Sequence, residues 1–155
     1  MSIQSLLNQI ERNEIILPAI QRSFVWEEER IIRLFDSVMR KYPVGIVLLW
    51  ETFNNIQYRI FDKVFNKGDI FSFQDNSDLK RVKLVLDGQQ RLQSLYLALY
   101  GNFTGKYLYF DILSGKDTEN VAEERYKFEF LDPDEAKKKN TWMKEKFSNV
   151  PEQLV

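Results

Sequence analysis

The feature that most constrains this fold is an abrupt change of hydrophobic period within residues 82–101. Residues 82–86 (VKLVL) are mostly apolar and rich in valine, as in a buried strand. The apolar residues that follow recur instead at the period of a helix, and these are Leu92, Leu95, Tyr96 and Leu99. The polar run 87–91 (DGQQR) stands between the two patterns. Asp-Gly favours a two-residue hairpin only where strands lie on both sides, so this stretch predicts a strand–turn–helix junction.

The rest of the chain alternates between helical and extended patterns, without an internal repeat. An apolar stripe after Ser2 predicts a first helix, and an apolar face after Glu27 predicts a second helix that ends before Pro43. Residues 62–81 are expected to form a loop that includes a short strand at 70–73. The strand at 46–50 is expected to be buried on both faces. The other expected strands are 15–17, 56–61, 106–113 and 125–131.

The composition excludes several kinds of active site. The 155 residues include no cysteine and no histidine. Disulfides, thiolate–metal sites, Ser-His and Cys-His nucleophile pairs and histidine-ligated zinc are therefore excluded. Any catalysis must rest on Asp, Glu, Lys, Arg, Tyr or a bound metal. With 22 basic and 23 acidic residues, the net charge of −1 gives no overall field that attracts DNA.

No stretch of the sequence is apolar for long enough to cross a membrane. The longest apolar run, residues 44–50, is far shorter than the roughly 20 residues of a membrane-spanning helix. The polar N-terminus lacks the apolar core of a signal peptide, and the absence of cysteine fits a reducing compartment. We therefore expect a cytoplasmic protein with no membrane partner.

The junction at residues 87–91 offers the parts of an anion site. A helix that begins there leaves its first backbone N–H groups unpaired, and these groups bind anions together with the helix dipole. Gly88 lets the backbone approach a phosphate closely, and Arg91 offers a planar fork to its oxygens. Gln89 and Gln90 bring amide groups, and Asp87 can accept from a ribose or bind Mg²⁺. From these residues alone, phosphate binding and a purely structural turn are both open.

A second Gln-Arg pair, Gln21-Arg22, lies between a short strand and the second predicted helix. Read by itself this segment is structural, with Trp26 in the core and Arg22 in a surface ion pair. Gln90-Arg91 is placed similarly at a helix start. If the two pairs converge in space, they form a cleft with two guanidinium groups. Two such groups repel each other without a ligand, so convergence would favour a bound phosphate.

The two stretches together resemble the N-terminal domain of the GmrSD-type, modification-dependent restriction endonucleases. The resemblance covers roughly residues 1–115 and rests on Pro18, Gln21, Arg22, Trp26, Leu34, Ser37, Tyr42, Pro43, Gly45 and residues 87–91. It implies an α+β, ParB/sulfiredoxin-like fold, in which a mixed sheet is flanked by helices. By the resemblance, residues 1–131 form a nucleotide-binding domain. Its phosphate-binding residues would be Gln21, Arg22, Gly88, Gln89, Gln90 and Arg91.

The resemblance further implies a role in defence against phage. In that family the domain is linked to binding and hydrolysis of a nucleoside triphosphate, which regulates an HNH nuclease directed at modified DNA. The expected ligand is GTP, ATP or CTP, with Mg²⁺ on Asp87 and with Asp87 and Gln90 as catalytic residues. Because an HNH nuclease needs histidine, this chain should not cut DNA alone, and we expect the nuclease as a separate domain or subunit.

Two alternative functions are open. In one, the same basic cleft binds modified DNA through a phosphate or a base; in the other, both motifs are caps of a structural or assembly domain. Residues 132–155 are charged, predict a helix that starts near Asp132, and lie beyond the resemblance. We expect them either to begin a region that continues in a longer protein or to end a truncated relative of one.

Overall fold

The computed structural model describes residues 2–53, 56–66, 74–75, 81–115 and 124–146. In these residues the helices are α1 (Ile3–Glu11), α2 (Glu28–Met39), α3 (Gln89–Tyr100) and α4 (Pro133–Lys146). The strands are β1 (Ile15–Pro18), β2 (Leu48–Thr52), β3 (Gln57–Arg59), β4 (Val64–Phe65), β5 (Gln74–Asp75), β6 (Val82–Asp87), β7 (Asn102–Phe103), β8 (Tyr107–Phe110) and β9 (Phe128–Leu131). The predicted α+β class is confirmed, whereas the strand expected at 70–73 lies outside the described residues.

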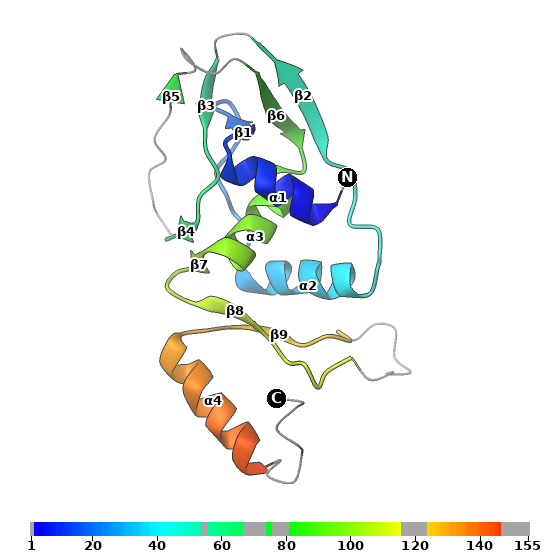
Figure 1. Ribbon diagram of the computed structural model, residues 1–155, viewed down its shortest axis with the longest axis vertical. Helices are drawn as coiled ribbons and strands as arrows, with labels where there is room; N and C mark the ends of the chain where they lie inside the picture. The colour runs from blue at the N-terminus through cyan, green and yellow to red at the C-terminus, as the bar shows by residue number, and fades with distance from the viewer. Residues whose placement is uncertain (1, 54–55, 67–73, 76–80, 116–123, 147–155) are drawn as a thin grey trace.

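The main sheet contains five strands in the order β2-β6-β1-β3-β5. β1 and β6 run parallel and the other neighbours are antiparallel, so the sheet is mixed, as expected. Figure 1 shows α1 and α3 in front of this sheet and α2 next to α3. Pro18 is the last residue of the central strand β1, where a missing N–H disturbs the sheet least. The segment that follows, residues 19–27, is called the connector below and leads into α2.

The core lies between this sheet and the helices. Alternate strand residues such as Leu17 and Val85 pack with α3, while Leu84 belongs to a second cluster on the opposite face. α3 contacts α1, α2 and β7, so it is buried on several sides. Leu97 is therefore fully buried, whereas Leu99, which the single-stripe prediction placed on the buried face, is 54% exposed.

The prediction of a strand at 46–50 buried on both faces is wrong. The strand begins at Leu48 and forms an edge of the sheet, with β6 as its neighbour. Leu49 packs against the core, but Leu48 and Trp50 are 53% and 48% exposed. A continuous apolar run does not distinguish a strand inside a sheet from one at its edge. Residues 40–47, called the α2–β2 segment below, approach this edge as an irregular chain.

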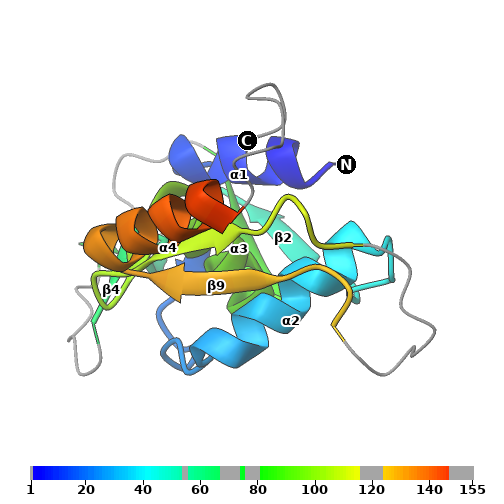
Figure 2. The same ribbon diagram turned by 90° about the horizontal axis from the view of Figure 1, so that it is seen from below.

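A smaller layer covers the helices on the side away from the sheet. β8 and β9 form an antiparallel pair that contacts α3 and α2, and α4 lies along β9 (Figure 2). The buried Asp36 of α2 accepts hydrogen bonds from the backbone N–H groups of Arg125 (3.1 Å) and Tyr126 (2.8 Å). Asp132 caps α4, as predicted, by accepting from the N–H of Asp134 at 2.9 Å. The division of the chain at residue 131 stays a prediction.

The helices in the described part of the chain are too short or too polar to cross a bilayer.

Candidate functional site

Residues 87–91 form the strand–turn–helix junction that the hydrophobic period predicts. β6 ends at Asp87, Gly88 is the N-cap residue of α3 with a φ of 88°, and the helix begins at Gln89. Only glycine adopts this left-handed conformation without strain. No side chain in the described part of the chain caps α3. The backbone N–H groups of its first turn are therefore available to an external acceptor, and the helix dipole favours an anion there.

The two glutamines of the junction hold the connector. Gln89 donates from Nε2 to the carbonyl oxygen of Arg22 at 2.8 Å. Gln90 donates to the carbonyl oxygen of Ser23 at 3.0 Å and accepts from the N–H of Val25 at 3.0 Å. Both ends of the Gln90 amide are used in these bonds. A catalytic role for Gln90 would therefore require it to release the connector.

Gln21 fixes the beginning of the connector to β6. Its Nε2 donates to the carbonyl oxygens of Val85 (2.7 Å) and Leu86 (3.0 Å). Arg59 Nη2 in turn donates to the carbonyl oxygens of Gln21 (3.1 Å) and Arg22 (3.2 Å). Burial of the Arg59 side chain lowers the pKa of its guanidinium. The backbone of the Gln21-Arg22 pair is thus fixed, while the Arg22 side chain takes no part in these bonds.

Arg91 has a structural use that its position in the sequence does not reveal. Its Nη1 donates to the carbonyl oxygen of Val44 and its Nη2 to that of Ile46, both at 2.7 Å. Gly45, between them, has a φ of 93°, and a Cβ there would lie 2.1 Å from Arg91 Nη1. Asp87 Oδ2 lies 3.4 Å from Arg91 Nη2. A basic residue at a helix start is expected to need an external anion or a carboxylate partner. The Asp87 carboxylate and the two carbonyl oxygens meet that need within the chain. Contact between Arg91 and phosphate stays a prediction.

Both Gln-Arg pairs lie at one hollow, a convergence that the sequence had left open. The hollow has a volume of about 420 Å³ and lies between the connector, the end of β6 and the first turns of α2 and α3. A volume of roughly 300–1,000 Å³ is typical of ligand sites. The lining residues are Gln21, Arg22, Trp26, Arg30, Leu86, Asp87, Gly88, Gln89, Gln90 and Arg91.

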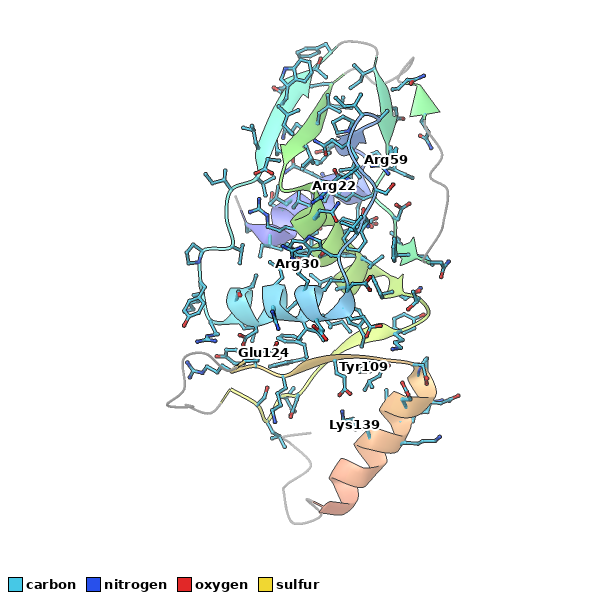
Figure 3. The ribbon with its side chains drawn as sticks, turned by 180° about the vertical axis from the view of Figure 1, so that it is seen from behind. Arg22, Arg30, Arg59, Tyr109, Glu124 and Lys139 are labelled. Atoms are coloured by element: carbon cyan, nitrogen blue, oxygen red, sulfur yellow. The ribbon has the colours of Figure 1, made fainter. Side chains whose placement is uncertain are left out.

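Sequence reasoning missed Arg30, the third arginine of the hollow. Its guanidinium carbon lies 4.8 Å from the centroid of the Trp26 ring. Arg30 follows Trp26 by four residues near the start of the helix, and this spacing is the sequence signal that would have found the pair. Figure 3 shows Arg22 and Arg30 on the same side of the molecule, between β6 and α2. Within the described residues, neither guanidinium has a hydrogen bond or an ion pair.

Asp87 is the one acidic side chain among the described residues that line the hollow. Its side chain is 71% exposed. The described part of the chain holds no group of three or more His, Cys, Asp or Glu side chains that could bind a metal by itself. Mg²⁺, however, often uses one or two carboxylates together with substrate phosphates. Asp87 therefore fits a Mg²⁺ that shares a bound phosphate, and does not fit a metal site made by protein side chains alone.

Comparison with known proteins extends the sequence resemblance beyond residue 115. The family model of the GmrSD restriction endonuclease N-terminal domain matches residues 3–154. The uncharacterized protein MJ0686 of Methanocaldococcus jannaschii is 32% identical over 116 residues, which is 70% of this chain and 20% of that protein. The chain thus spans about a fifth of this relative's length. Because the family model covers nearly all residues, this chain belongs to the family of GmrSD restriction endonuclease N-terminal domains.

Proposed function

We propose that this chain is a nucleotide-binding regulatory domain of a GmrSD-like anti-phage restriction system. The observation that carries the proposal is the Arg22 guanidinium, which lines the hollow at the start of α3 without an acidic partner in the described residues. The matching family is named for a restriction endonuclease, and we extend a role in such a system to this chain. The chain has no histidine, so an HNH nuclease centre would lie in another domain or subunit.

The phosphates of the nucleotide would lie at the first turn of α3. Its free backbone N–H groups would donate to phosphate oxygens, and Gly88 would let the backbone come close. Arg22 would bind a phosphate through two parallel hydrogen bonds. Gln21, Gln89 and Gln90 would support this contact by holding the connector that carries Arg22. Arg91 would add positive charge to the wall while it keeps its carbonyl partners.

We propose weak, Mg²⁺-dependent hydrolysis of GTP, ATP or CTP as the activity of this site. Phosphoryl transfer depends mostly on positioning and on charge neutralisation, so the lack of histidine is no obstacle. Bound Mg²⁺ would supply part of that neutralisation. Asp87, which is exposed at the rim of the hollow, would hold the metal together with the phosphates or orient a water molecule.

Thermal unfolding with each nucleotide tests the proposal. Saturation at about 100 times Kd stabilises a protein by about 2.7 kcal/mol, which raises Tm by roughly 5–10 °C for a domain of this size. We expect such a shift for at least one of GTP, ATP and CTP with Mg²⁺. Arg22→Gln should remove most of the shift. Arg33→Gln, which removes the same charge from an arginine that pairs with Glu124, should keep it.

The absence of a shift with every nucleotide would contradict the proposal. The DNA-sensing alternative predicts instead that modified DNA binds and that Arg22→Gln weakens this binding. Its affinity would fall steeply with salt if several phosphates are contacted. The structural alternative predicts no ligand response in any variant.

A further inference from the structure

Arg22 and Arg30 stand apart from the other arginines of the chain in their lack of an acceptor. Arginines with a carboxylate partner are Arg12, Arg33, Arg40 and Arg81. Arginines that donate to backbone carbonyl oxygens are Arg59, Arg91 and Arg125. In the described residues, the guanidiniums without either kind of acceptor are those of Arg22 and Arg30, and both line the same hollow.

No carboxylate of the described residues forms an ion pair with Arg30. Glu28, in the same turn of α2, is paired with Lys106 at 3.3 Å. Asp87 is the acidic residue of the lining, and it lies 3.4 Å from Arg91. The described lining therefore carries three positive side chains and one negative side chain. Like charges in one hollow repel each other, so a bound anion would relieve an unfavourable arrangement.

The Trp26 ring positions the Arg30 guanidinium at the edge of the hollow. Trp26 packs against the main hydrophobic core, so its ring is held in place, and Arg30 lies over its face at 4.8 Å. Arg22 approaches from the connector and Arg30 from α2, while the start of α3 forms a third side. Two guanidiniums that reach one hollow from different elements suit a chain of phosphates, which offers an anionic group to each.

We propose that Arg30 is a further binding residue of this site, which together with Arg22 holds a linear polyphosphate group and so selects di- and triphosphates over monophosphates. This inference rests on the proposed function, because it assigns the phosphate chain of the same ligand. The polyphosphate belongs either to a nucleoside di- or triphosphate or to inorganic pyrophosphate or triphosphate. Arg30 reads the phosphate chain that these ligands share, and not the nucleoside.

Calorimetric titration of the full chain with Mg²⁺ tests this assignment. The ligands are inorganic phosphate, pyrophosphate and triphosphate, and in parallel AMP, ADP and ATP. Arg30→Gln removes the charge but keeps a polar side chain at an exposed position. A charged hydrogen bond of about 1.5–3 kcal/mol corresponds to a loss of about 10- to 100-fold in affinity for inorganic triphosphate and for ATP. Binding of phosphate and AMP should change little.

Arg33→Gln is the matched control, since Arg33 lies on the same helix and pairs with Glu124 instead of lining the hollow. It should bind every ligand as the wild-type chain does, and both variants should keep the wild-type Tm. Arg30→Lys should recover part of the affinity for triphosphates, because it restores the charge without the fork.

Three results with Arg30→Gln would overturn the assignment while the proposed function stands. They are unchanged binding in Arg30→Gln, an equal loss for mono- and triphosphates, and a loss for ATP without a loss for inorganic triphosphate. An equal loss in Arg33→Gln would also overturn it, since a general charge effect would then explain the result. A wild-type chain that binds none of these compounds would reject the proposed function itself.

Discussion

The two Gln-Arg pairs of this chain share a sequence but use their arginines in opposite ways. In both pairs the glutamine donates to backbone carbonyl oxygens and ties two segments together. Arg91 donates to Val44 and Ile46 and is mostly buried, with 19% of its side chain exposed. Arg22 is exposed at the hollow and has no acceptor in the described residues.

The two arginines differ because different backbone segments lie next to them. The α2–β2 segment turns around Arg91, and Gly45 leaves room for the guanidinium against the backbone. The carbonyl oxygen of Arg22 accepts from Arg59 and Gln89. The Arg22 guanidinium has no acceptor of its own in the described residues and lines the hollow. The role of a Gln-Arg motif is therefore set by the acceptors that the fold brings near it, and not by the motif alone.

Arg91→Ala should cause the largest loss of stability. It leaves the carbonyl oxygens of Val44 and Ile46 without a charged donor, and such a loss costs about 3 kcal/mol. Arg22→Ala is the matched comparison and should change the free energy of unfolding by less than about 0.5 kcal/mol. Urea denaturation measures both values. If both substitutions lower the free energy of unfolding equally, Arg91 has no greater structural role than Arg22.

Gln90→Ala should destabilise the chain by about 2 kcal/mol. Gln90 is 8% exposed and satisfies both Ser23 and Val25 of the connector. Its loss removes two partly buried hydrogen bonds, each of which contributes about 0.5–1.5 kcal/mol. Denaturation curves give the stability, and hydrogen exchange should show faster exchange at the Val25 amide. Unchanged exchange at Val25 would mean that Gln90 does not hold the connector.

Gly45→Ala should destabilise the chain by about 1 kcal/mol more than Gly105→Ala does. Both glycines have positive φ, at 93° and 82°, so each substitution carries the same backbone strain. At position 45 the new Cβ also meets Arg91 Nη1 at 2.1 Å, whereas nothing lies within 4 Å at position 105. In an Arg91→Ala background the extra loss should disappear, because the clash is gone. An extra loss that persists there would show that Arg91 is not its cause.

The sequence predicted the junction well, but it misjudged the burial of β2, missed β7, and missed β4 and β5 within the expected loop 62–81. A change of period and a glycine are local signals, so the start of α3 at Gln89 could be found from residues 82–101. Burial depends on neighbours that are distant in sequence. The edge position of β2 and the exposure of Leu99 therefore have no local signal.

The candidate site was predictable to the extent that its motifs are local. The two pairs could each be placed at a helix start from the sequence, but their convergence at one hollow depends on the fold and was left open. The acceptors of Arg91 lie 47 and 45 residues earlier in the chain, at Val44 and Ile46, and only Gly45 marks them in the sequence. Arg30 was missed because a single arginine on a helix looks like an ordinary solvated residue.

The most direct test of the account is the affinity for ATP with Mg²⁺, measured by calorimetry in the wild-type chain, in Arg22→Gln and in Arg91→Gln, at a temperature where all three are folded. The account predicts that Arg22→Gln weakens binding by about 10- to 100-fold, as expected for the loss of a charged hydrogen bond. Arg91→Gln should stay within about fivefold of wild type, which corresponds to the loss of a neighbouring charge worth under about 1 kcal/mol. A large loss in Arg91→Gln together with wild-type affinity in Arg22→Gln would contradict it.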